Sequence, residues 1–143
     1  MTAEKSTLVT DIDKEVFEQV AEIWDNLRKN VLGKESFKPI ELISKWLQVL
    51  TGSYMYLTTR YTAARIARDN NEVAIYMRLK NDAVAADTKF VSAPADREAR
   101  SEVSELVEFE RVFESYQKAA EQGILTLKKL LEIQVLELQQ ESK

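Results

Sequence analysis

The chain has 143 residues, which is enough for one domain with its own core or with a share of an oligomer's core. It contains no cysteine and no histidine, which excludes disulfides, thiolate nucleophiles and zinc–sulfur sites and removes the commonest proton-transfer side chain near neutral pH. The net charge is −4, and the three glycines form no glycine-rich phosphate loop, so we expect a non-enzymatic protein without a cofactor or a metal.

The first predicted helix spans residues 10–32, because apolar side chains recur in it at steps of three and four. These side chains are Ile12, Val16, Phe17, Val20, Ile23, Trp24 and Leu27. Thr10 or Asp11 would cap its beginning, and Gly33 would end it. The acids of the stretch "DIDKE" fit a helix N-terminus, where negative charge is favourable, better than a cation site, because the spacing and the glycine of an EF-hand are missing.

A second helix is predicted over residues 39–88, with Pro39 in its first turn, where the missing N–H costs little. Gly52 is the one breaker inside it, so the segment forms either one long helix or two nearly continuous helices bent at Gly52. A glycine within a helix costs about 1 kcal/mol relative to alanine, which a long packed helix can absorb. Apolar residues recur along it at Leu42, Ile43, Trp46, Leu47, Leu50, Leu57, Ala64, Val73, Ala74 and Met77. Core packing is the expected role of both tryptophans, Trp24 and Trp46.

A third helix is predicted over residues 95–140, after a turn that ends at Pro94. The residue before a proline disfavours helical geometry, which places the boundary there. No stretch alternates apolar and polar residues with the period of a strand. The fold class expected from these patterns is all-α: a long antiparallel helical hairpin plus an N-terminal helix, in one domain over residues 1–143 that assembles as a helical oligomer.

The C-terminal segment "GILTLKKLLEIQVLELQQ" is apolar on more than one side of its helix. Burial inside a monomer core is one explanation. Self-assembly, in the manner of a coiled coil, is the favoured one, because a chain of two or three helices has difficulty covering several faces of one of them. Each leucine buried in this way contributes about 1.5 to 3 kcal/mol. The residues predicted to form this oligomerisation surface are Ile124, Leu127, Leu130, Leu131, Val135 and Leu138.

Basic and aromatic residues gather in "SYMYLTTRYTAARIAR", at positions 53–68. Eight basic and six acidic residues lie between positions 60 and 100, whereas both flanks carry more acids than bases. A basic track beside aromatic faces is typical of proteins that bind single strands, and several copies in an oligomer would strengthen a weak patch. The alternative is a solvated face whose bases pair with acids of neighbouring helices. The predicted nucleic-acid-binding residues are Arg60, Tyr61, Arg65, Arg68, Arg78 and Lys80.

Three stretches resemble the recombination mediator proteins of T4-type bacteriophages: "SKWLQ" at 44–48, "SAPADREA" at 92–99 and "LKKLLEI" at 127–133. The resemblance covers roughly residues 40–135, although "RLKNDAVAADTKF" at 78–90 is less basic than the family's glycine-containing middle segment. It implies an all-helical protein that binds single-stranded DNA, assembles through its C-terminal helix, and contacts a recombinase and a single-strand-binding protein during DNA recombination.

Two other functions are consistent with the sequence. A helical viral structural, scaffold or adaptor protein, acting through protein–protein contacts with no nucleic-acid role, explains the acidic balance more simply. An enzyme that uses carboxylates and a metal would need three or four acids to converge in a pocket. The sequence contains no membrane span and no secretory signal, so the expected location is the cytoplasm, or the host cytoplasm for a viral protein.

Overall fold

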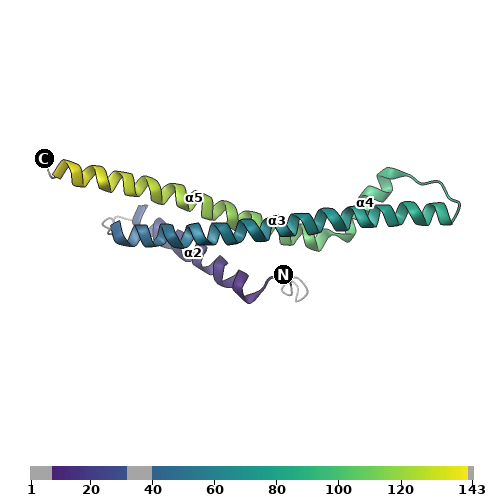
Figure 1. Cartoon of the computed structure of the whole chain (residues 1–143), viewed down its shortest axis with the longest axis horizontal. Coiled ribbons are helices and arrows are strands. Elements are labelled where there is room, and N and C mark those ends of the chain that lie inside the picture. The colour runs from purple at the N-terminus through teal and green to yellow at the C-terminus, as the bar shows by residue number, and fades with distance from the viewer. Residues whose placement is uncertain (1–7, 32–39, 142–143) are drawn as a thin grey trace.

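The computed structural model describes residues 8–31 and 40–141, and all the regular structure in these two ranges is helical. The helices are α2 (Asp11–Val31), α3 (Ile40–Ala85), α4 (Ser92–Glu102) and α5 (Ser104–Glu141). The molecule is elongated: α3 forms its long axis, α5 returns beside α3 in the opposite direction, and α2 lies across the half of the molecule where α3 begins (Figure 1). None of these helices combines the length and the apolar character needed to cross a membrane.

Helix α2 begins with a reciprocal cap. The backbone N–H of Asp13 donates to the hydroxyl of Thr10 at 3.1 Å, and the Thr10 N–H donates to the Asp13 carboxylate at 2.9 Å. Two of the backbone donors at this helix end are thereby satisfied, which confirms Thr10 as the cap. The predicted apolar stripe of α2 is mostly buried, but Ile12 is exposed. The predicted stop at Gly33 and the predicted first turn at Pro39 lie outside the described residues.

Helix α3 runs for 46 residues without a break at Gly52. A Cβ atom placed on Gly52 would meet nothing within 4 Å, so this glycine is an ordinary exposed helical position. The helix ends at Ala85, and Asp87, two residues later, has a left-handed φ of 52°. The N–H groups of Thr88 and Asp87 donate to the carbonyls of Ala83 and Val84, at 2.9 and 3.1 Å. This pair of hydrogen bonds is a Schellman motif, with aspartate at the position that glycine usually occupies.

The single helix expected over residues 95–140 is two helices in the structure. Helix α4 starts at Ser92, so Pro94 lies in its first turn, where the N–H that proline lacks would have no helical partner. Val103, with φ −97° and ψ 13°, separates α4 from α5. Its side chain is buried, so the change of direction between the two helices is fixed by packing. A local pattern of apolar residues does not reveal such a one-residue interruption.

The core lies where α2, α3 and α5 meet, and Trp24 and Trp46 both pack against it, as expected. Gly123 of α5 is buried there, and a Cβ atom on it would lie 2.7 Å from Cδ1 of Leu50. The indole N–H of Trp24 donates to the carbonyl of Ala119 at 2.8 Å, one turn before this glycine. The missing side chain therefore lets α5 approach α2 and α3 closely.

Candidate functional site

Arg60 is the first residue of the predicted nucleic-acid patch, and its guanidinium group is bound by other residues of the same chain. Its Nε and Nη2 atoms donate to the two carboxylate oxygens of Asp13, at 3.1 and 3.0 Å. The guanidinium carbon also lies 5.6 and 5.2 Å from the ring centres of Phe109 and Phe113, within the range of a cation–π interaction. Arg60 thus joins α2, α3 and α5, and only 31% of its side chain is exposed.

Asp13 is the buried partner that holds this arginine in place. Its side chain is fully buried, and the hydroxyl of Tyr56 donates to it at 2.6 Å. Burial alone raises the pKa of Asp13, but the hydrogen bonds from Arg60, Tyr56 and the Thr10 backbone outweigh it, so the pKa lies below its ordinary value. Burial and the same hydrogen bond raise the pKa of Tyr56. The cluster is therefore an ionised aspartate whose charge is compensated inside the fold.

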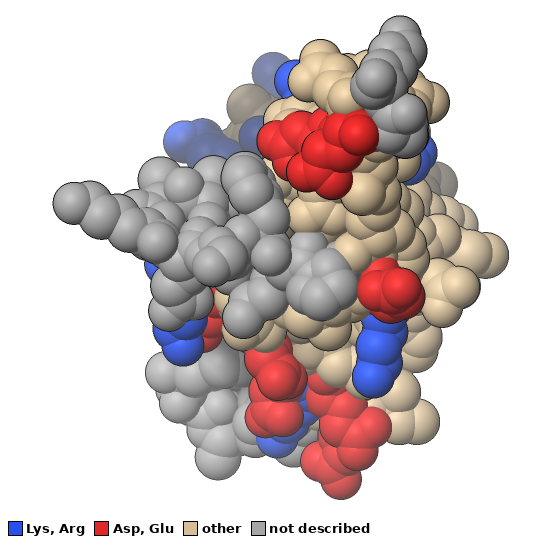
Figure 2. Space-filling model, turned by 90° about the vertical axis from the view of Figure 1, so that its left-hand side faces the viewer, with Lys and Arg blue, Asp and Glu red and all other residues tan. Residues whose placement is uncertain are grey.

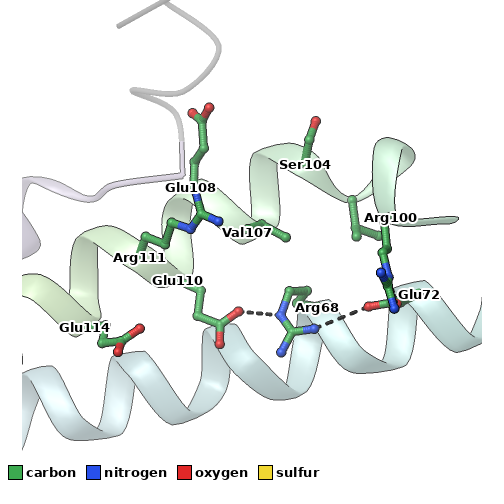
Figure 3. A pocket seen from close by; sticks show the side chains of 10 residues that line it. Arg68, Glu72, Arg100, Ser104, Val107, Glu108, Glu110, Arg111 and Glu114 are labelled. Atoms are coloured by element: carbon green, nitrogen blue, oxygen red, sulfur yellow. Dashed lines mark hydrogen bonds and ion pairs between the residues drawn. The ribbon is translucent and has the colours of Figure 1, made fainter. Parts of the chain in front are cut away.

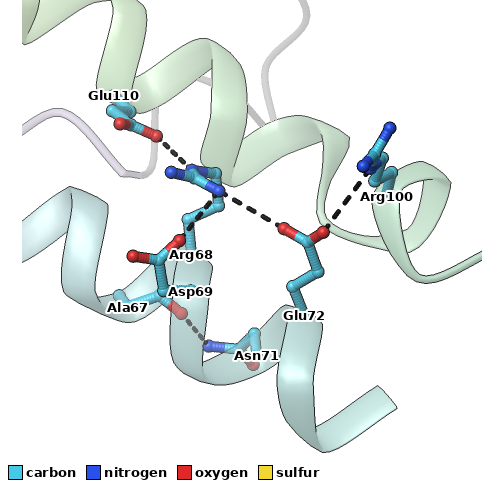
Figure 4. A network of polar contacts seen from close by, with 7 residues as sticks. All are labelled: Ala67, Arg68, Asp69, Asn71, Glu72, Arg100 and Glu110. Carbon is cyan, nitrogen blue, oxygen red and sulfur yellow. Dashed lines mark hydrogen bonds and ion pairs between the residues drawn. The ribbon is translucent and has the colours of Figure 1, made fainter. Parts of the chain in front are cut away.

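Arg68 is the centre of a second network, which joins α3, α4 and α5 (Figure 4). Its Nε atom pairs with Glu110 of α5, and its Nη1 atom lies 2.9 Å from Asp69 and 3.3 Å from Glu72. The carboxylate of Glu72 also forms an ion pair with Arg100 of α4, with 3.6 Å between Glu72 Oε1 and Arg100 Nε. The hydrogen bond to Glu110 is the main cause that raises the pKa of Arg68, and it outweighs burial, which lowers this pKa. The guanidinium of Arg68 is therefore permanently charged. A guanidinium with three acidic neighbours has little capacity left for a phosphate.

An open cavity of about 700 Å³ lies beside this network, between α3 and the junction of α4 with α5. Glu110 and Arg68 point toward each other between the helices, whereas Ser104 and Glu108 point away from α3 (Figure 3). Four glutamates line the cavity, but three arginines lie among them, and no group of three or more acids in the described ranges is arranged to hold a metal ion. The lining residues are Arg68, Glu72, Arg100, Val103, Ser104, Val107, Glu108, Glu110, Arg111 and Glu114.

The other predicted patch residues fall into two groups. Arg78 donates through Nη2 to both oxygens of Glu102 at 3.1 and 3.0 Å, and Tyr61 is half-buried against the core. Arg65 and Lys80 are exposed, and neither forms an ion pair with another described residue. Three of the five predicted bases are therefore paired with acids of the same chain, so two per copy remain for an anionic ligand.

The predicted oligomerisation residues are also divided between interior and surface. Leu127 is fully buried, and Ile124, Leu130 and Leu131 pack against the core. Val135 and Leu138 are exposed, as is every described residue after Gln134. The last turns of α5 extend past the start of α3 in Figure 1. Large apolar side chains that are 44 to 57% exposed occur at Leu125, Ile133, Val135, Leu136 and Leu138. Seen from this end, uncharged surface extends along one side of the molecule, with both acidic and basic groups beside it (Figure 2).

Sequence reasoning missed the acidic partners of the predicted bases. Asp13 lies 47 residues before Arg60, and Glu110 lies 42 residues after Arg68, so no local spacing connects either pair. One signal was available for Glu110, because it occurs three residues before the buried Phe113 on the face of α5 that packs against α3. An acid on an apolar helical stripe predicts a buried basic partner.

No protein-family model, no curated protein and no solved structure matches this chain.

Proposed function

We propose that this chain is a non-enzymatic helical protein that acts through self-association, and that the end of α5 is the surface by which copies bind each other. The observation that carries this proposal is the concentration of exposed apolar side chains at Ile133, Val135, Leu136 and Leu138. A group of exposed large apolar side chains of this kind marks interaction sites in soluble proteins. The segment continues a helix whose earlier turns bury one face in the core, and a second copy of α5 supplies a surface of the same chemistry.

The test compares two variants by sedimentation over a range of protein concentrations. Val135→Glu/Leu138→Glu places two charges on the apolar end, and we expect its average mass to fall at least twofold below that of the wild type. Gln140→Glu is the control, because it adds charge to the same exposed turn without removing an apolar side chain. An unchanged mass in the double variant, with helicity preserved, contradicts the proposal.

The second candidate function is single-stranded DNA binding. It includes the wider role of a recombination mediator that contacts a recombinase and a single-strand-binding protein. Arg65 and Lys80 favour it, because both are exposed and form no ion pair with a described residue. The two unpaired cations of the predicted patch make a weak site, so binding of useful strength requires an assembly that repeats them. With two phosphates neutralised per copy, the affinity falls with about the 1.4th power of salt concentration for each copy bound.

The DNA candidate is tested by fluorescence anisotropy with a labelled single-stranded oligonucleotide at low and moderate salt. We expect Arg65→Ala/Lys80→Ala to weaken binding at least tenfold. Lys14→Ala/Lys45→Ala removes the same charge from two other exposed helical positions and serves as the control. Equal losses in both variants indicate a non-specific charge effect. No binding by the wild type at low salt leaves the helical scaffold or adaptor as the function.

A further inference from the structure

A second apolar stripe lies on α3, separate from the end of α5. Its four large side chains are 46 to 73% exposed: Ile66, Val73, Met77 and Val84, here called the outer stripe. At 100° per residue they lie within about 40° of one another around the helix. The buried residues Leu50, Leu57 and Ala64 project about 180° away, toward the core. Helix α3 is therefore apolar on two opposite sides, and the side turned away from the core is exposed.

The spacing of the outer stripe is that of a coiled-coil seam. Its members follow one another at intervals of seven, four and seven residues, as the a and d positions of successive heptads do. Asn70 and Lys80 occupy the two remaining positions of this seam. A single asparagine at an a position is a common device for fixing the register between two helices. The pattern therefore matches a helical partner better than a small-molecule ligand.

The stripe is complementary to itself when a second α3 runs in the opposite direction. With the two-fold axis near residue 75, Ile66 lies opposite Val84 of the other copy, and Val73 lies opposite Met77. Each pair joins an a position with a d position, as antiparallel helices require. The same register places Asn70 opposite Lys80. One surface thus satisfies both sides of a two-fold interface, which is the condition for an isologous dimer.

The charges on the stripe favour the same direction. Asp69 and Lys80 are the only charged residues within about 60° of its centre between positions 62 and 85. An antiparallel pair places Lys80 of one copy beside Asp69 of the other, whereas a parallel pair in register sets Lys80 against Lys80. Opposite charges are stabilising at such positions and like charges are not. Small residues at Ala63 and Ala74 border the seam and allow close approach.

The size of the stripe suits a modest interface. Four side chains of these types and exposures present on the order of 400 Å² per copy, or roughly 800 Å² for two copies before bordering residues are counted, against about 1,200 Å² for a small specific interface. We propose that α3 of one copy pairs with α3 of a second copy through the outer stripe, antiparallel and centred near residue 75. This contact is separate from the one at the end of α5 and does not depend on it.

The first experiment measures mass in solution. Val73→Glu/Met77→Glu charges the centre of the stripe at two exposed positions, so the fold is retained, and we expect the average mass to fall at least twofold below that of the wild type. Met55→Glu is a matched control, because Met55 is 66% exposed on the same side of α3 but lies outside the paired stretch 66–84. A double variant with the mass of the wild type overturns the proposal. A loss equal to that of Met55→Glu also overturns it.

The second experiment tests direction and register by cross-linking, which is simple because the chain has no cysteine of its own. Ile66→Cys carrying an affinity tag is mixed with Val84→Cys and treated with a short bismaleimide. We expect cross-links in the mixture at least tenfold above those of either variant alone, since two copies of residue 66 lie about 27 Å apart in this register. Self-cross-linking of Ile66→Cys, or no cross-linking in the mixture, overturns the proposed pairing.

Discussion

Gly52 and Gly123 lie inside long helices in opposite surroundings, so alanine at each position separates the effect of helix propensity from that of packing. Alanine is favoured over glycine in a helix interior by about 1 kcal/mol. A Cβ atom on Gly52 meets no atom within 4 Å, so Gly52→Ala receives this gain in full. Its free energy of unfolding should rise by about 1 kcal/mol.

Gly123→Ala receives the same gain but encounters a steric cost. The added Cβ atom lies 2.7 Å from Cδ1 of Leu50, and Nε1 of Trp24 is 3.5 Å away. Leu50 is fully buried, so its methyl group can move only by disturbing neighbours in the core. Extra methyl groups in a packed core cost about 1 to 3 kcal/mol. The net effect should be a loss of up to about 2 kcal/mol, and the two variants should differ by about 1 to 3 kcal/mol.

Urea unfolding followed by far-ultraviolet circular dichroism measures both changes, at one protein concentration because self-association contributes to the apparent stability. The urea midpoint should move up for Gly52→Ala and down for Gly123→Ala. Equal stabilisation of the two variants would refute the reasoning, since it would mean that α5 can retreat from Leu50 and Trp24 without cost. Leu50→Ala combined with Gly123→Ala adds a further check, because removing the opposing methyl groups should relieve the clash.

Two further predictions concern the ends of α2 and α3. Asp13→Asn leaves Arg60 without its carboxylate and should lower the free energy of unfolding by about 1 to 3 kcal/mol at neutral pH, less than for a wholly buried pair because Arg60 is partly hydrated. The fold lowers the pKa of Asp13 from 3.8, so its ionised form stabilises the protein above about pH 4. This contribution is lost as the pH falls through the lowered pKa. The difference in the free energy of unfolding between wild type and variant, measured with urea, should therefore shrink from pH 7 to about pH 3. Asp87→Gly relieves the left-handed backbone at the end of α3 and should raise the thermal midpoint through a gain of about 0.5 to 1 kcal/mol, and a lower midpoint would contradict this interpretation of the Schellman motif.

The helical segments were predictable because each one repeats apolar residues at helical spacing or carries its own cap. Thr10 and its partner Asp13 are three residues apart, so the start of α2 was visible in the sequence. The interruption at Val103 was not, because that residue continues the apolar pattern and its backbone angles are set by packing. Gly52 suggested a bend that the structure lacks, since an exposed glycine alone does not break a helix that is packed on its other side.

The candidate site was less predictable, because its contacts are tertiary. The spacing of Arg60, Arg65 and Arg68 placed them correctly on one helix, but Arg60 pairs with Asp13 of α2 and Arg68 pairs with Glu110 of α5, more than forty residues away. The apolar pattern of α5 assigned Leu127 to the oligomerisation surface, but the structure buries this residue in the core of the single chain, as the alternative explanation held. It did not indicate which members of that predicted surface a single chain leaves exposed, because that depends on where α3 begins relative to the end of α5.

The distribution of buried residues along α3 makes the two halves of the molecule unequal in their resistance to local opening. No residue of α3 after Ala64 is buried, and in this half the ion pairs of Arg68 and Arg78 help to hold the helix to α5 and α4. Ion pairs are weakened by salt, whereas the apolar core around Leu50 and Phe113 is not. Amide hydrogens near residue 80 should therefore exchange with solvent sooner than those near residue 50, and added salt should increase this difference in exchange rate. Local opening is thus expected to begin at the C-terminal end of α3.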